Sequence, residues 1–63
     1  MNTTQAVTNT IIHIITGGDV GQARLWADAH SDVVARMSRN QRRAVAHACS
    51  RWGIPSILPA VAP

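Results

Sequence analysis

Apolar residues recur at helical spacing in three successive segments of this 63-residue chain. In the first segment, residues 3–16, they stand three or four positions apart, at Val7, Ile11, Ile14 and Ile15. This spacing places them on one face of a helix of about four turns. The part from 8 to 16 is also rich in β-branched residues, which favours a strand by propensity. We expect a helix, because Gly17 and Gly18 follow where a left-handed residue ends a helix, and because no second strand is present for pairing.

The second segment, residues 20–37, carries the most regular pattern of the chain. Its seam positions alternate three and four apart, at Val20, Ala23, Ala27, His30, Val34 and Met37, with Leu25, Trp26 and Val33 widening the seam. A continuous seam of this kind predicts one unbroken helix. Ser31 and Asp32 offer an alternative, since a capping residue here would start a new helix and divide the segment in two. We favour the unbroken helix because the seam continues through this place.

The third segment, residues 39–52, has one apolar and one basic face. The apolar face holds Gln41, Val45, Ala48, Cys49 and Trp52, and the opposite face holds Arg39, Arg43, His47 and Ser50. Gly53, Ile54 and Pro55 then give the expected signals for the end of a helix. Residues 54–63 form an apolar tail interrupted by proline, and we expect Ile57 and Leu58 to dock it on the bundle or on a partner.

A capping residue followed three positions later by glutamine opens each of these segments. The pairs are Asn2 with Gln5, Asp19 with Gln22, and Ser38 with Gln41. The cap accepts a hydrogen bond from a backbone N–H of the first turn, and the glutamine reaches back to the backbone N–H of the cap. The sequence therefore predicts an all-α three-helix bundle, with helices at about 3–16, 20–37 and 39–52. We expect a single domain over 1–63, with 54–63 as its irregular tail.

Size and composition make partners important for this chain. A domain this short buries only about 60% of its unfolded surface. Cys49 is the single cysteine, so no internal disulfide can form, and the core lacks both Phe and Tyr. Self-association into a homodimer or binding to a larger protein is the remaining source of stability. No stretch approaches the ~20 apolar residues of a membrane span and the start is unlike an export signal, so we expect a cytoplasmic protein without membrane contact.

Metal binding and catalysis are both unsupported by the residue pattern. His47 and Cys49 lie two apart on one predicted helix, which turns their side chains about 200° from each other. No Cys-x-x-Cys or His-x-x-x-His pair occurs, so we expect no metal site. His30 with Asp28 or Asp32 could supply a base and an acid, but so short a chain has little room for a catalytic cleft. We therefore expect neither an enzyme nor a cofactor.

Positive charge is concentrated in the second half of the chain. The formal net charge is +3, the three acids all lie between Asp19 and Asp32, and five of the six arginines follow Val33. This asymmetry indicates an anionic partner, although a merely solvated helix face would have the same composition. The candidate partner-binding residues are Arg36, Arg39, Arg42, Arg43, His47, Arg51, Trp52, Ile57 and Leu58.

Part of the chain resembles the small negative regulators of AraC-type activators, which are short helical proteins associated with phages and other mobile elements. The residues that carry the resemblance are Gly18, Asp19, Val20, Ala23, Trp26, Ala29, Asn40, Arg43 and Cys49. The resemblance implies a non-enzymatic regulator that binds a transcription factor or nucleoid protein and blocks its dimerisation or its contact with DNA.

Two functions are compatible with the basic face. The first is a small regulatory or inhibitory protein that binds a larger protein, because arginine makes bidentate contacts with carboxylates. The second is direct binding of DNA or RNA, because two adjacent helices with a basic second helix resemble a helix-turn-helix and arginine also contacts phosphates. A cationic peptide that acts on membranes is a weaker third alternative.

Overall fold

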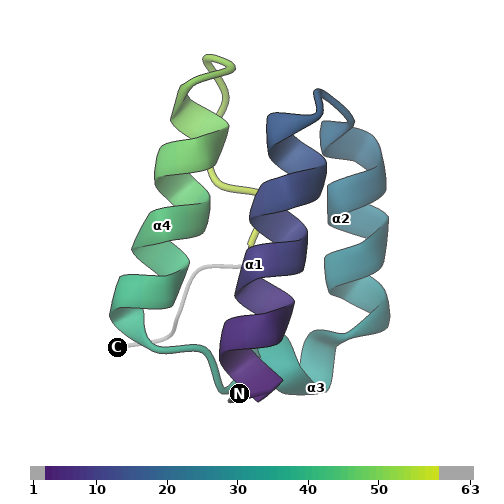
Figure 1. Cartoon of the computed structure of the whole chain (residues 1–63), viewed down its shortest axis with the longest axis vertical. Coiled ribbons are helices and arrows are strands. Elements are labelled where there is room, and N and C mark those ends of the chain that lie inside the picture. The colour runs from purple at the N-terminus through teal and green to yellow at the C-terminus, as the bar shows by residue number, and fades with distance from the viewer. Residues whose placement is uncertain (1–2, 59–63) are drawn as a thin grey trace.

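The computed structural model describes residues 3–58, which form a small bundle of four helices. These are α1 (Thr3–Thr16), α2 (Val20–Ala29), α3 (Ser31–Val34) and α4 (Arg39–Ser50). Helix α1 packs against the other three. Figure 1 shows α2 and α4 on either side of α1, with α2 running opposite to α1 and α4 running in the same direction. The predicted all-α bundle is therefore confirmed, and residues 8–16 are helical.

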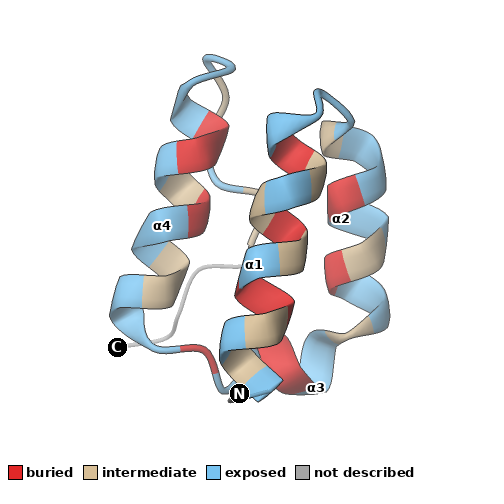
Figure 2. Ribbon diagram, in the orientation of Figure 1, coloured by how far each residue is buried: buried red, intermediate tan, exposed pale blue. Residues whose placement is uncertain are grey.

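Burial outweighs β propensity in α1. Val7, Ile11 and Ile15 are buried on its inner side, where they form the centre of the core (Figure 2). Because tertiary packing supplies most of the stability of a protein helix, this face decides the conformation. The hydroxyl of buried Thr8 donates a 2.6 Å hydrogen bond to the carbonyl oxygen of Thr4, so its polar group is satisfied inside the helix.

Both predicted glycine stops lie where α1 and α4 end. Gly18 has φ +93° and Gly53 has φ +71°, a left-handed conformation that other residues rarely adopt. Each end is closed by the six-residue hydrogen bond of a Schellman motif: Asp19 N–H to Ile14 O at 3.3 Å, and Ile54 N–H to Cys49 O at 3.4 Å. The helix ends are thus fixed by local sequence, with α4 ending at Ser50 rather than at Trp52.

Two of the predicted caps are also confirmed. The Asp19 carboxylate accepts a 3.1 Å hydrogen bond from the backbone N–H of Gln22. Ser38 and Gln41 form a reciprocal capping box, in which the Gln41 N–H donates to Ser38 Oγ at 3.1 Å and the Ser38 N–H donates to Gln41 Oε1 at 2.8 Å. Asn2, the third predicted cap, lies outside the described residues.

The predicted unbroken helix over 20–37 is wrong, because the chain leaves the helical conformation at His30. The Nδ1–H of His30 donates a 2.8 Å hydrogen bond to the carbonyl of Trp26, while the backbone N–H of His30 turns to the carbonyl of Ala27 at 3.1 Å. In a continuous helix that backbone N–H would bond to the Trp26 carbonyl. The imidazole has taken this acceptor and stacks on the Trp26 ring, with centroids 3.9 Å apart. Helix α3 then begins at Ser31.

The sequence pattern places Leu25 in the buried seam, and this expectation is wrong. Its side chain is 65% exposed, whereas Ala23 and Ala27 are buried. Leu25 lies two residues from each of them, which places it about 200° around the helix axis from both. The apolar side of α2 is therefore narrower than the sequence pattern predicts.

The tail turns back over the bundle after Gly53 and passes behind α1 in Figure 1. Ile54, Ile57 and Leu58 are half-buried and pack against the core. The expected docking of Ile57 and Leu58 is thus confirmed on this chain's own bundle. The rest of the tail, 59–63, lies outside the described residues.

Candidate basic interface on helix α4

Four basic residues form a line along the exposed side of α4 and the residue that caps its end, Arg51. We call Arg39, Arg43, His47 and Arg51 the basic stripe. They are four positions apart, so each lies about 6 Å further along the axis and about 40° further around it than the one before. All four side chains are exposed, while Val45, Ala48 and Cys49 on the other side of α4 are buried. The stripe therefore presents its charge entirely to solvent.

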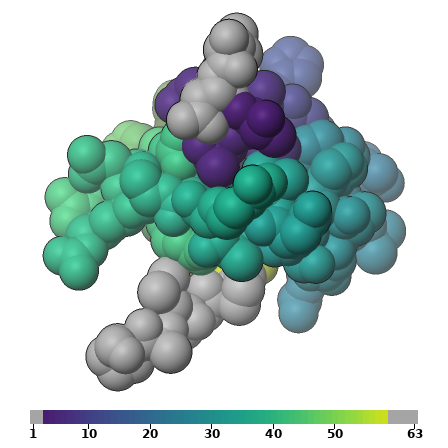
Figure 3. Space-filling view, turned by 90° about the horizontal axis from the view of Figure 1, so that it is seen from below, coloured from purple at the N-terminus to yellow at the C-terminus, as the bar shows by residue number. Residues whose placement is uncertain are grey.

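Gln41 fixes α4, and with it the stripe, relative to α1. Its side-chain Nε2–H group donates to Thr4 Oγ1 at 3.2 Å and to Gln5 Oε1 at 3.3 Å. The beginnings of α1 and α4 are thereby held at the same end of the bundle. Figure 3 shows this end, where the first turn of α1 adjoins α3 and side chains at the start of α4 project outward.

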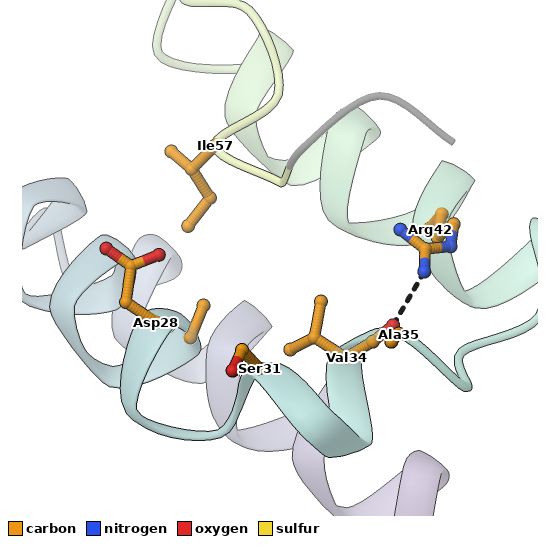
Figure 4. Close-up of a pocket in the computed structure, with 7 residues that line it drawn as sticks. Asp28, Ser31, Val34, Ala35, Arg42 and Ile57 are labelled. Carbon is orange, nitrogen blue, oxygen red and sulfur yellow. Dashed lines mark hydrogen bonds between the residues drawn. The ribbon is translucent and has the colours of Figure 1, made fainter. Parts of the chain in front are cut away.

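Arg42 does not lie in the stripe, although we predicted it from the sequence as a partner-binding residue together with the other arginines. Its Nη2 donates a 2.7 Å hydrogen bond to the carbonyl of Val34, and its Nε donates to the carbonyl of Met37 at 3.3 Å. These carbonyls belong to the end of α3 and the turn that follows, and the Val34 carbonyl also accepts the backbone N–H of Met37 at 3.1 Å. Figure 4 shows the Arg42 side chain reaching across to this backbone. Its guanidinium group is therefore engaged in hydrogen bonds within the chain.

Ile57 also has an internal role. It lines a pocket of about 90 Å³ whose other walls include Ala27 and Asp28 of α2, Val34 of α3, and Arg42. In Figure 4, Asp28 and Arg42 lie at opposite ends of this pocket and Ile57 covers it from the tail side. The residue therefore closes the junction of α2, α3 and α4.

Trp52 stands just beyond the last residue of the stripe and is 52% exposed. It lines a pocket of about 210 Å³ together with Thr16, Ala48 and Arg51, between the ends of α1 and α4. A Cβ built on Gly18 would lie 3.6 Å from the Trp52 ring, so the ring rests over the turn between α1 and α2. Sequence reasoning found Trp52 but missed Thr16, since nothing local indicates that these two helices end side by side.

All three acidic residues lie in or next to α2 and α3. Asp19 caps α2, Asp28 lies within α2 and Asp32 lies in α3, whereas α4 contains no acidic residue. Figure 1 places α2 and α4 on opposite sides of α1. Arg36 is exposed in the turn between α3 and α4. No carboxylate of α4 therefore neutralises the stripe.

The histidines, the cysteine and the acidic residues are side chains that could serve as metal ligands or as catalytic groups. Within residues 3–58, no three His, Cys, Asp or Glu side chains gather closely enough to hold a metal ion. His30 is engaged with the backbone and ring of Trp26. In the same range, none of the helices has the length and apolar character required to cross a membrane.

Comparisons of this chain with protein-family models, with curated proteins and with solved structures find no match.

Proposed function

We propose that this chain is a small non-catalytic regulatory protein that binds an acidic surface of a larger protein through the basic stripe. The observation that carries the proposal is the line of Arg39, Arg43, His47 and Arg51, all exposed on a helix that contains no acid. Guanidinium groups bind carboxylates through two parallel hydrogen bonds, which gives orientation as well as attraction. Complementary charge also speeds association with an acidic partner.

The regulatory part of the proposal rests on the resemblance of residues 18–51 to the small negative regulators of AraC-type activators. The partner would be a transcription factor or another nucleic-acid-binding complex in the cytoplasm. A basic helix that fills an acidic groove of such a partner would block dimerisation or another contact made there. An origin in a phage or another mobile element follows from the same resemblance.

Direct binding of DNA or RNA is the second candidate function, and it is supported by the use of arginine rather than lysine on α4. Arg39 and Arg43, one turn apart, suit a row of phosphates as well as a row of carboxylates. Binding of this kind would depend steeply on salt, with log K falling by about 0.9 per phosphate contact for each unit of log salt concentration.

An affinity pull-down of the tagged chain from host lysate, with and without nuclease treatment, separates the two candidates. The proposal predicts one protein that is retained in stoichiometric amount after nuclease treatment and identified by mass spectrometry. Loss of every captured protein on nuclease treatment would contradict it and would favour the nucleic-acid function.

A further inference from the structure

The pocket beside Trp52 is continuous with the basic stripe. Arg51 belongs to both, since it is the last residue of the stripe and also lines the pocket. His47 stands one turn before it on the same side of α4. A ligand that contacts His47 and Arg51 therefore lies next to the pocket.

The lining of the pocket suits an apolar side chain next to a carboxylate. Ala48 and Trp52 contribute a methyl group and an indole ring. The Thr16 hydroxyl donates a hydrogen bond to the carbonyl oxygen of Ile12, with 2.8 Å between the two oxygens. Of the lining residues, Arg51 carries a charge. The volume of about 210 Å³ is several times the ~30 Å³ share of a water molecule, which leaves room for one large side chain.

The ring of Trp52 forms one wall of the pocket and lies over the turn between α1 and α2, since a Cβ built on Gly18 would stand 3.6 Å from it. The ring is 52% exposed, so its free side offers apolar surface to a ligand. Tryptophan and arginine side by side are also the residues that most often dominate the affinity of protein interfaces.

We infer that the pocket receives an apolar side chain from an acidic segment of the partner protein, whose carboxylates lie along the basic stripe. The ligand is thus a peptide segment with acids at intervals of about one helical turn and an apolar anchor beyond them. A helix with Glu at every fourth position matches the stripe, because both repeat at about 6 Å. This inference rests on the proposed function and names the chemistry of its partner.

Two labelled peptides test the inference on the full chain. The first is a 16-residue Ala peptide with Glu at every fourth position and Leu at each end, so that either direction of binding places a Leu at the pocket. The second has Ala in place of both Leu residues. Fluorescence anisotropy at low salt gives the dissociation constants, and we expect the Leu peptide to bind about fivefold tighter than the Ala peptide.

Substitutions in the chain test whether the difference in affinity between the two peptides comes from the pocket beside Trp52. Trp52→Ala should make the two peptides bind equally, and so should Thr16→Leu, which fills the pocket from α1 and guards against a folding defect in the first variant. Leu25→Ala, which removes the exposed apolar side chain of α2, should leave the difference unchanged. Arg43→Gln should weaken both peptides by the same factor.

Each negative result would contradict a different part of the proposal. Equal binding of both peptides to the unmodified chain would overturn the pocket assignment and leave the stripe intact. Failure of both peptides to bind would overturn the proposed function itself. Tighter binding of a 16-nucleotide oligo(dT) than of either peptide would overturn the assignment of a protein partner.

Discussion

The imidazole Nδ1–H of His30 donates a 2.8 Å hydrogen bond to the carbonyl oxygen of Trp26, and the helix that contains Trp26 ends there. The two rings also stack, with centroids 3.9 Å apart. One side chain thus makes both a polar and an aromatic contact at the junction of α2 and α3. The sharp change of direction after α2 depends on this pair.

His30→Ala should therefore destabilise the fold. The substitution removes a hydrogen bond and a ring contact, each worth about 1 kcal/mol, and recovers part of this through the higher helix propensity of Ala. We expect the free energy of unfolding, measured by urea denaturation, to fall by about 1 kcal/mol. His13→Ala on the exposed side of α1 is the control and should change little. Unchanged stability of the His30 variant would show that the pair does not hold the junction.

Substitution of Arg42 should lower the stability of the fold, whereas substitution of its neighbour Arg43 should leave stability almost unchanged. Arg42→Gln removes charged donors from the carbonyls of Val34 and Met37, and we expect it to lower the free energy of unfolding by about 2 kcal/mol. Arg43→Gln changes an exposed residue and should alter stability by less than about 0.5 kcal/mol. Urea denaturation of the two variants checks this contrast, and equal stabilities would contradict the internal role of Arg42.

Alanine substitutions at Gly18 and at Gly21 should change the stability of the fold in opposite directions. Gly18→Ala places a side chain at φ +93°, which we expect to cost about 1–2 kcal/mol through backbone strain. Gly21 lies within α2, and no atom stands within 4 Å of the place that a Cβ would take there, so Gly21→Ala should raise stability by about 0.5–1 kcal/mol. The melting temperature of each variant, compared with that of the unmodified chain, shows the direction of the change. A stabilising Gly18→Ala would contradict the left-handed helix end.

The helix ends could be predicted from sequence because their signals are local. The glycines at 18 and 53 and the capping pairs after Gly17 act within one turn of the helix that they end or begin. The break at His30 could not be predicted in this way, because an imidazole and a backbone N–H compete there for one carbonyl without disturbing the apolar seam. Periodicity predicts which positions are buried, and Ala23, Ala27, Val34 and Met37 are buried although the helix is interrupted between them.

The basic stripe could be predicted from the sequence, but the position of Arg42 and the pocket beside Trp52 could not. The spacing of Arg39, Arg43 and His47 on one helix placed them on one exposed side. The inward turn of Arg42 depends on where α3 ends, which the sequence does not reveal. The pocket beside Trp52 requires in addition that α1 and α4 run in the same direction, so that Thr16 meets the end of α4.

A matched pair of charge variants tests whether the basic stripe of α4 binds an acidic protein. Arg43→Gln and Arg24→Gln each remove one exposed arginine, the first from the stripe and the second from α2. The measurement is the amount of partner protein that each tagged variant retains from nuclease-treated lysate. We expect Arg43→Gln to retain several-fold less partner than the unmodified chain and Arg24→Gln to retain as much. Equal retention by both variants would contradict it.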